Sequence, residues 1–393
     1  MRNVYLDNNA TTAVAPEVRE AMMPFFGELY GNPSSMHAFG GQVAKHVAAA
    51  REQVAAFFNC EPDEVIFTSC ATESDNTAIR GTADWFGNDL KVVTTAVEHP
   101  AVLQPCRRLK AQGVEEVELP VDGVGQIDLD RLRAELKGAK NPLVSAMWAN
   151  NETGTVFPIR EIAEIAKENG AAMHTDAVQA AGKVPLDMKS VPVDFLAISG
   201  HKFHAPKGVG ALFVRRGAKL KPFMLGGHQE SGRRAGTENV AYIVGLAKAC
   251  ELATARMDEE ARQLAALRDR LEAGILAACP NTRVNGDRAH RLPNTLNVSF
   301  EYIEGESIAY HLSDLGICIS TGSACASGSL DPSHVIRAMG VPFTAVHGSV
   351  RFSLSRYNTS ADIDYVLEHL PPVIKKLRDL SPFGPGKGPT TFQ

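Results

Sequence analysis

The sequence predicts an α/β fold built on a doubly wound, mostly parallel sheet and followed by a smaller second domain. From about residue 40 to 215, short apolar runs alternate with helical patterns, as in parallel strands linked by crossover helices. Two later segments, 296–300 and 349–355, alternate apolar and polar residues and predict strands of the smaller domain. The 393 residues, 44% of them hydrophobic, suffice for two or more domains with sizeable cores.

The elements of the predicted sheet follow one another along the chain. Six mostly apolar runs predict its strands, at 64–68, 91–95, 143–148, 170–175, 193–198 and 210–214. A helix is expected to begin near Ala71, where small and hydroxylated residues follow the first run. The long amphipathic stretch from about Val240 to Cys279 predicts helices that lead into the second domain. The Pro- and Gly-rich tail at 381–393 is expected to be poorly ordered.

Composition and charge argue against several classes of function. The formal net charge of −5 argues against a protein that binds nucleic acids or membrane surfaces. The seven cysteines are odd in number, widely spaced and without a Cys-x-x-Cys pair, which indicates reduced thiols rather than disulfides or structural zinc. The amino terminus lacks a signal peptide, and no apolar run is long enough to span a bilayer. We therefore expect a cytoplasmic enzyme.

An acid and a lysine follow two neighbouring strands of the predicted sheet. Asp176 ends the run 170–175, and Lys202 follows the run 193–198 in the sequence Ser-Gly-His-Lys. Open α/β sheets bind ligands at the carboxyl ends of parallel strands. Pyridoxal 5'-phosphate (PLP) needs a lysine amine as its covalent anchor and a carboxylate beside its ring nitrogen. The pair supplies both, although a lone Asp or Lys is more often a helix cap or a surface residue.

A phosphate site is predicted where the strand 64–68 gives way to a helix. Ala71 and Thr72 lie at the expected helix start, where free backbone N–H groups and the helix dipole favour a dianion. Ser199 and His201 are polar groups that would add hydrogen bonds. Thr72 taken alone is as readily explained as a helix N-cap. Neither a Gly-x-Gly-x-x-Gly turn nor a P-loop is present, which disfavours dinucleotide and nucleotide binding.

One thiol lies in an unusual segment. Ten consecutive small or hydroxylated residues surround Cys325, from Ser320 to Ser329, and such a run predicts a mobile surface loop. A thiol with a pKa near 8.5 is only about 3% thiolate at pH 7, so Cys325 needs activation to act as a nucleophile. An incidental loop cysteine is the alternative explanation.

Seven motifs occur in order along the chain, at 5–12, 31–35, 71–74, 98–99, 150–154, 199–202 and 322–325. Together they resemble the class I, NifS/IscS-like cysteine desulfurases over essentially the whole chain. The resemblance implies the PLP-dependent transferase fold type I, with a mostly parallel seven-stranded sheet in a large domain at 15–255. A smaller α/β domain at 1–14 and 256–380 would carry the catalytic cysteine on a mobile loop at about 320–334.

The resemblance also assigns catalytic roles. Lys202 would anchor PLP and then move the substrate Cα proton. His99 would stack on the cofactor ring and assist proton transfer, and Cys325 would take up the sulfur. A persulfide on Cys325 is also the candidate ligand of an iron-sulfur cluster. Taken alone, His99 would more often be a buried structural histidine.

Binding roles follow from the same resemblance. Asp176 would pair with the pyridine nitrogen, and Gln179 would hydrogen-bond the phenolic oxygen. Arg351 would bind the substrate carboxylate with its planar fork, although a surface ion pair is its alternative. The cofactor-binding set is Ala71, Thr72, Asn151, Asp176, Gln179, Ser199, His201, Lys202 and Thr237, with Thr237 reaching in from the partner subunit of a homodimer and Asn151 also touching substrate.

The implied reaction removes sulfur from L-cysteine, giving L-alanine and a persulfide on Cys325 that passes to an iron-sulfur scaffold protein. The segments 201–208, 226–230 and 330–335 resemble the nitrogen-fixation branch of the family more than the housekeeping branch, which also serves tRNA thiolation. Ala326 stands where many relatives have Thr.

A PLP aminotransferase has no use for Cys325, and class II desulfurases or selenocysteine lyases carry an Arg-x-Gly-His-His-Cys loop that is absent here. A non-catalytic sulfur-carrier scaffold is a further alternative, which PLP binding would exclude.

Overall fold

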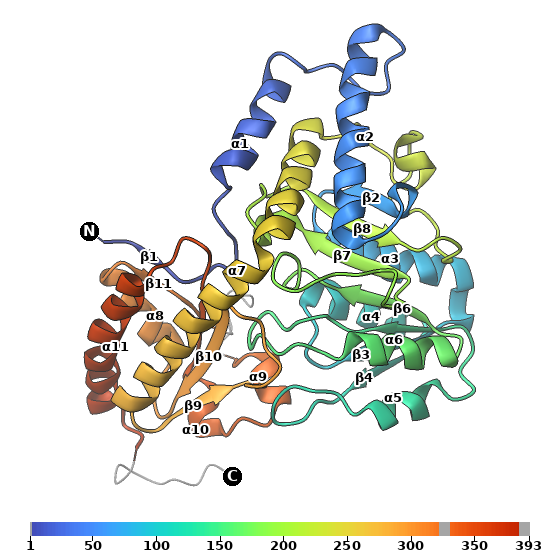
Figure 1. Ribbon diagram of the computed structural model, residues 1–393. Coiled ribbons are helices and arrows are strands. Elements are labelled where there is room, and N and C mark those ends of the chain that lie inside the picture. Colours follow the sequence, from blue (N-terminus) through green and yellow to red (C-terminus); the bar gives the residue numbers. More distant parts are fainter. Residues whose placement is uncertain (1, 322–330, 385–393) are drawn as a thin grey trace.

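A seven-stranded sheet forms the centre of the larger part of the molecule (Figure 1), in a computed structural model that describes residues 2–321 and 331–384. Its strands are β2 Val65–Thr68, β3 Lys91–Thr95, β4 Glu115–Leu119, β5 Pro142–Ser145, β6 Ala172–Asp176, β7 Phe195–Ser199 and β8 Gly210–Val214. They lie in the order β2-β8-β7-β6-β5-β3-β4. Every neighbouring pair is parallel except the two pairs of β8, which is antiparallel to β2 and β7. The predicted mostly parallel, seven-stranded sheet is confirmed.

Helices cover both faces of this sheet. They are α2 Ala38–Phe58, α3 Ala71–Phe86, α4 Pro100–Ala111, α5 Leu129–Leu136 and α6 Ile159–Glu168. Successive residues of a strand point to opposite faces. Accordingly, Val92 and Leu143 pack in a cluster with α3 and α4, whereas Val93 and Val144 pack in another with α2, α5 and α6. The fold is therefore doubly wound, as the sequence predicts.

A second hydrophobic core lies against a four-stranded antiparallel sheet in the order β12-β13-β10-β9. Its strands and its two covering helices are β9 Thr282–Asn285, β10 Thr295–Phe300, β12 Ser320–Thr321, β13 Ser349–Ser353, α8 Gly305–Asp314 and α11 Ser360–Leu380. The strands predicted at 296–300 and 349–355 are thus present. Three shorter helices are α1 Pro16–Met22, α9 His334–Ala338 and α10 Phe343–Val346.

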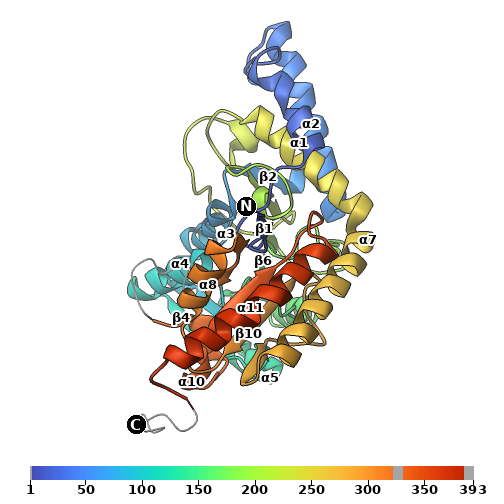
Figure 2. The ribbon, with the colours of Figure 1, turned by 90° about the vertical axis from the view of Figure 1, so that its left-hand side faces the viewer.

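One helix links the two cores. The sequence predicted several helices between Val240 and Cys279, and this was wrong: α7 Val240–Ala278 is a single helix of 39 residues, with no proline to interrupt it. Its first half contributes Leu246 to the core of the larger sheet, and its second half contributes Leu271 to the second core. Figure 2 shows its second half running beside α11. The domain boundary at residue 255 falls inside α7 and stays a prediction.

The amino-terminal segment belongs to the second core before it reaches the first. β1 Val4–Tyr5 pairs in parallel with β11 Ile317–Cys318, and Asp7 forms a further bridge with Ser353. The side chains of Val4 and Leu6 are buried in the second core. The first residues of the chain are therefore held by residues more than 300 positions later.

The same segment then lies along the residues that follow β7. The backbone N–H of Thr12 donates to the carbonyl oxygen of His201 (2.8 Å), and the N–H of His204 donates to the Thr12 hydroxyl (2.8 Å). The N–H of Ala15 donates to the carbonyl oxygen of His204 (3.0 Å). We call residues 4–15 the N-terminal strap, because they hold together the second core and the residues around Lys202.

We expect acid to destabilise the fold through His204. This side chain is buried, its Nδ1 lies 2.9 Å from the carbonyl oxygen of Ala13, and burial together with the charge of Arg356 lowers its pKa to about 4. The unfolded chain, with a histidine pKa of about 6.5, then binds the proton first as the pH falls. Unfolding free energy attributable to His204 is thus lost between about pH 6.5 and pH 4.

The variant His204→Asn tests this, because the backbone φ of 74° at this position is one that Asn tolerates. Its loss of unfolding free energy between pH 7 and pH 4 should be smaller than that of the wild type by up to about 3 kcal/mol. Urea unfolding at the two pH values measures both losses. Equal losses would contradict the assignment to His204.

No helix within residues 2–321 and 331–384 has the length and apolar character needed to cross a membrane. The tail expected to be poorly ordered is described only as far as residue 384, so that expectation remains a prediction.

Candidate active site

A cavity of about 420 Å³ opens at the carboxyl ends of β5, β6 and β7 and is closed on one side by the second sheet. It brings together ten of the predicted site residues: Ala71, Thr72, His99, Asn151, Asp176, Gln179, Ser199, His201, Lys202 and Arg351. Thr237 is exposed and is not among the residues that line it in this chain. Cys325 lies outside the described residues, as does most of the loop predicted at 320–334.

Asp176 supplies a carboxylate at the floor of the cavity. It is the last residue of β6 and is only 6% exposed, and its Oδ1 accepts the backbone N–H of Val178 (2.9 Å). Burial raises the pKa of this carboxyl, while the nearby His99, this hydrogen bond and Lys202 act in the opposite direction. A cationic ligand atom beside Asp176 would favour the ionised form further.

Lys202 presents its amine to the same cavity. It follows β7 in the short helical turn Gly200–Lys202, and its Nζ donates to the carbonyl oxygens of Asn9 (2.7 Å) and Ala10 (2.9 Å). Both acceptors belong to the N-terminal strap. The strap therefore holds the lysine at the carboxyl end of β7.

His99 is a further titratable residue that lines the cavity. It is the N-cap of α4, where its Nδ1 accepts the backbone N–H of Ala101 (3.1 Å). Burial lowers the pKa of the imidazole, and the positive charge of Lys202 adds to this, against the opposing carboxylate of Asp176. A neutral imidazole that accepts at Nδ1 must carry its proton on Nε2. His99 therefore offers a single N–H donor from Nε2.

The start of α3 forms the opposite end of the cavity. Its N-cap is Cys70, whose side chain does not cap the helix, so within residues 2–321 and 331–384 the first N–H groups of the helix have no side-chain acceptor. Thr72 is thus not the N-cap, which excludes the alternative explanation for this residue. His201 lies nearby with its Nδ1 at 3.2 Å from the Thr11 hydroxyl, and burial and neighbouring lysines lower its pKa to about 4. A dianion fits these donors.

Arg351 projects from β13 of the second sheet. Its side chain is largely buried, and its guanidinium donates to the carbonyl oxygen of Asn151 (2.9 Å) and to Oδ1 of Asp7 (2.7 Å). These contacts fix the plane of the fork. The alternative of a surface ion pair is excluded, because the ion pair with Asp7 lies at the cavity.

Sequence reasoning missed several lining residues, notably Asn9 and Asp75. Asp75 is fully buried on α3, and its Oδ1 lies 3.3 Å from Nε2 of His174, although the angle does not make a hydrogen bond. The Nδ1 of His174 is 2.8 Å from the Ser145 hydroxyl. Burial raises the pKa of Asp75 well above its usual range and lowers that of His174 to about 3. The only sequence signal was the position of Asp75, one helical turn after Ala71.

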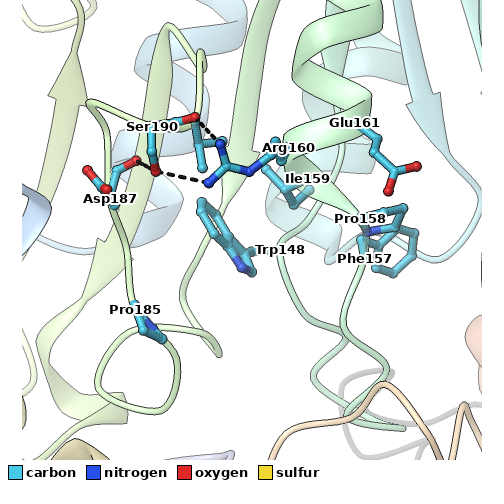
Figure 3. A pocket seen from close by; sticks show the side chains of 10 residues that line it. Trp148, Phe157, Pro158, Ile159, Arg160, Glu161, Pro185, Asp187 and Ser190 are labelled. Carbon is cyan, nitrogen blue, oxygen red and sulfur yellow. Dashed lines mark hydrogen bonds between the residues drawn. The ribbon is translucent and has the colours of Figure 1, made fainter.

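A separate pocket of about 550 Å³ lies elsewhere on the surface (Figure 3). The guanidinium of Arg160 donates there to the carbonyl oxygen and the hydroxyl of Ser190. None of the predicted site residues lines this pocket, whose lining is Trp148, Phe157, Pro158, Ile159, Arg160, Glu161, Pro185, Asp187, Ser190 and Val191.

The lining of the 420 Å³ cavity fits a phosphorylated pyridine aldehyde. The carboxylate of Asp176 suits a protonated ring nitrogen, and the uncapped start of α3 suits a phosphate. The amine of Lys202 is placed to anchor an aldehyde, and Arg351 suits a substrate carboxylate.

Comparison with known proteins gives a consistent result. Residues 4–366 match the family model described as Aminotransferase class-V. A cysteine desulfurase from Trichormus azollae is 57% identical over 383 residues, which cover 98% of this chain and 96% of that protein. The cysteine desulfurase NifS of Azotobacter vinelandii is 54% identical over 390 residues, or 99% and 97% of the two chains. A solved NifS-like protein superposes with a TM-score of 0.90 at 39% identity, covering 96% of this chain and all of that one.

Proposed function

Because the chain belongs to the aminotransferase class-V family and, within it, to the cysteine desulfurases, we propose that it uses PLP to remove sulfur from L-cysteine. The products are L-alanine and a persulfide on Cys325. The observation that carries this assignment is that Asp176, Lys202 and Arg351 line one cavity with the uncapped start of α3.

Each residue of the site has its own role. When bound, PLP withdraws electrons from the substrate, so that the Cα proton becomes acidic and the Cβ–S bond can break. Asp176 would pair with the ring nitrogen and keep its proton in place. The N–H groups of Ala71 and Thr72, with Ser199 and His201, would hold the phosphate. Asn151 would contact both the ring and the substrate.

Arg351 binds the substrate carboxylate and orients the Cα–H bond toward Lys202, whose amine accepts the proton. With PLP bound, His99 would donate from Nε2 beside the ring. The Cys325 thiolate then attacks the substrate sulfur: the new S–S bond forms as the Cβ–S bond breaks, and the electron pair stays on the Cβ side. Protonation at Cβ and return of a proton from Lys202 to Cα complete L-alanine.

We further propose that the protein works as a cytoplasmic homodimer and passes sulfur to an iron-sulfur scaffold protein. Thr237 supports the dimer, because it is exposed and does not line the cavity of its own chain, as expected of a residue that completes the partner's phosphate site. The relation to NifS supports an acceptor in nitrogenase maturation, with a housekeeping acceptor as the alternative. An iron-sulfur cluster bound through the Cys325 persulfide is a third proposal.

The test is the yield of alanine and sulfide from L-cysteine, measured with purified PLP-loaded protein and a thiol reductant. Equal yields of the two products over many turnovers are expected. A loaded protein that instead transfers the amino group to a keto acid, without release of sulfur, would contradict the proposal and favour an aminotransferase.

Arg351→Lys should raise KM for L-cysteine by about 10- to 100-fold, because Lys retains the charge but not the bidentate fork that is worth about 1.5–3 kcal/mol on a carboxylate. The effect on kcat should be smaller, since the carboxylate is bound before and during the reaction. Steady-state kinetics measure both constants. Arg283→Lys, on β9 of the same sheet and outside the cavity, is the matched control. An unchanged KM in Arg351→Lys would show that Arg351 does not bind the substrate carboxylate.

A further inference from the structure

Lys183 is a half-buried lysine that the mechanism above does not use. It follows Gln179 by one turn, in a bend where Gly182 has a φ of +74° and where a Cβ would lie 2.9 Å from the Cβ of Phe203. The Nζ of Lys183 donates to the carbonyl oxygen of Gln179 (3.0 Å) and approaches its side-chain Oε1 (3.4 Å). The lysine is thus folded back onto a residue that lines the cavity.

The surroundings of Lys183 disfavour its charge. Burial and the positive charges of Lys202 and Arg351 lower its pKa to about 7, and the His204 imidazole is a further titratable neighbour. No carboxylate pairs with Lys183 in the described parts of the chain, 2–321 and 331–384. An amine without a counterion gives no gain in stability from charge pairing. Charge pairing therefore does not explain the position of Lys183, and its hydrogen bonds to Gln179 need another explanation.

Those hydrogen bonds decide which way the Gln179 amide faces. The Nε2 of Gln179 donates to the backbone carbonyl oxygen of Asn9 (2.9 Å), which also accepts the amine of Lys202 (2.7 Å). A backbone carbonyl only accepts, and Lys183, in the protonated form that prevails below its pKa of about 7, only donates. A flipped amide would place oxygen against the Asn9 carbonyl and N–H against the lysine, and would lose both interactions. Lys183 and Asn9 thus select the same orientation.

The selected orientation leaves one donor for the cavity. The Nε2 group carries two N–H bonds, of which Asn9 takes one. We propose that Lys183 is a positioning residue, which fixes the Gln179 amide so that its second N–H is presented to the phenolic oxygen of PLP. This inference rests on the proposed function, because it takes PLP as the ligand of the cavity.

The test measures the pH at which the visible absorption change of PLP-loaded protein is half complete, in the wild type and in variants. This midpoint does not depend on turnover. A donor to the phenolic oxygen stabilises its negative charge, so losing the donor should raise the midpoint. We expect Lys183→Met to raise it by about one pH unit, the size of one hydrogen bond to a charged oxygen. Lys183→Arg, which keeps a charged donor, should restore most of the shift. Lys189→Met, at an exposed lysine nearby, should leave the midpoint unchanged.

A double variant separates positioning from a direct effect of the lysine charge. In a Gln179→Leu background, Lys183→Met should shift the midpoint no further, because the group that it orients is absent. A shift that persists in full in that background, or a midpoint unchanged in Lys183→Met itself, would overturn the inference. If Lys183→Met does not fold, Lys183→Leu, which also lacks a donor, provides the same comparison, with the same expected direction.

These outcomes are distinct from a failure of the proposed function. A wild-type protein that binds PLP but releases no sulfur would contradict the desulfurase activity, yet the midpoints would still decide the role of Lys183. A wild-type protein that does not bind PLP would overturn both.

Discussion

Lys202→Ala is expected to abolish turnover, with a loss of at least about 10³-fold, and to remove the covalent attachment of PLP. The amine of Lys202 lines the cavity and is held there by Asn9 and Ala10. Alanine leaves no nucleophile at this position and no base for the substrate Cα proton. The variant should still fold, because the amine donates to backbone carbonyls of the strap, which backbone hydrogen bonds also hold at both ends.

The measurement is borohydride reduction of PLP-treated protein, which fixes the cofactor onto the amine that holds it, followed by peptide mass analysis. The wild type should carry the label on Lys202, and Lys202→Ala should carry none. Lys207→Ala, at an exposed lysine five positions later, is the matched control and should be labelled like the wild type. A label that moves to Lys183 and sustains turnover would disprove the assignment of Lys202 as the anchor.

Cys325→Ala is expected to bind PLP and L-cysteine normally but to form no persulfide, and sulfide release should fall by at least about 10³-fold. The cofactor contacts proposed above involve no atom of Cys325, so cofactor absorption should match the wild type. Intact-protein mass after exposure to L-cysteine, without reductant, reports the added sulfur atom. Cys60→Ala is the control, since burial raises the pKa of that thiol to about 12 and makes it unreactive.

Cys70 is a specific alternative to Cys325 as the nucleophile. Among the described residues, Cys70 is the one thiol that lines the cavity. If persulfide were lost in Cys70→Ala and retained in Cys325→Ala, the nucleophile would be Cys70 instead.

The candidate site was largely predictable because several of its residues come at the ends of strands of the larger sheet or directly after them. Asp176 ends β6, Lys202 follows β7 and Ala71 begins the helix after β2, so each is marked by a local change from apolar to polar residues. The carboxyl ends of parallel strands meet at one sheet edge, which turns three local signals into one site. The resemblance to cysteine desulfurases supplied the residues without such signals, such as Arg351.

Other features depend on contacts between distant residues, which local patterns do not encode. Asn9 holds Lys202 across 193 positions, and Asp75 lies beside His174 only because α3 packs on β6. The continuity of α7 was missed because its apolar stripe changes partners midway. The antiparallel β8 did have a signal: ten residues separate it from β7, fewer than a parallel crossover requires.

The N-terminal strap has a consequence for biosynthesis. β1 is made well before its partner β11, which begins at residue 317, and the bridge from Asp7 needs Ser353. The larger sheet, complete by residue 214, can form before those partners are made, because domains generally fold as their residues emerge. The strap cannot dock on its own sheet partners until residues 317–353 have been made. The carbonyls that hold Lys202 would therefore reach their final positions only after the larger sheet has formed, so the cavity should mature, and load its cofactor, later than the sheet beneath it.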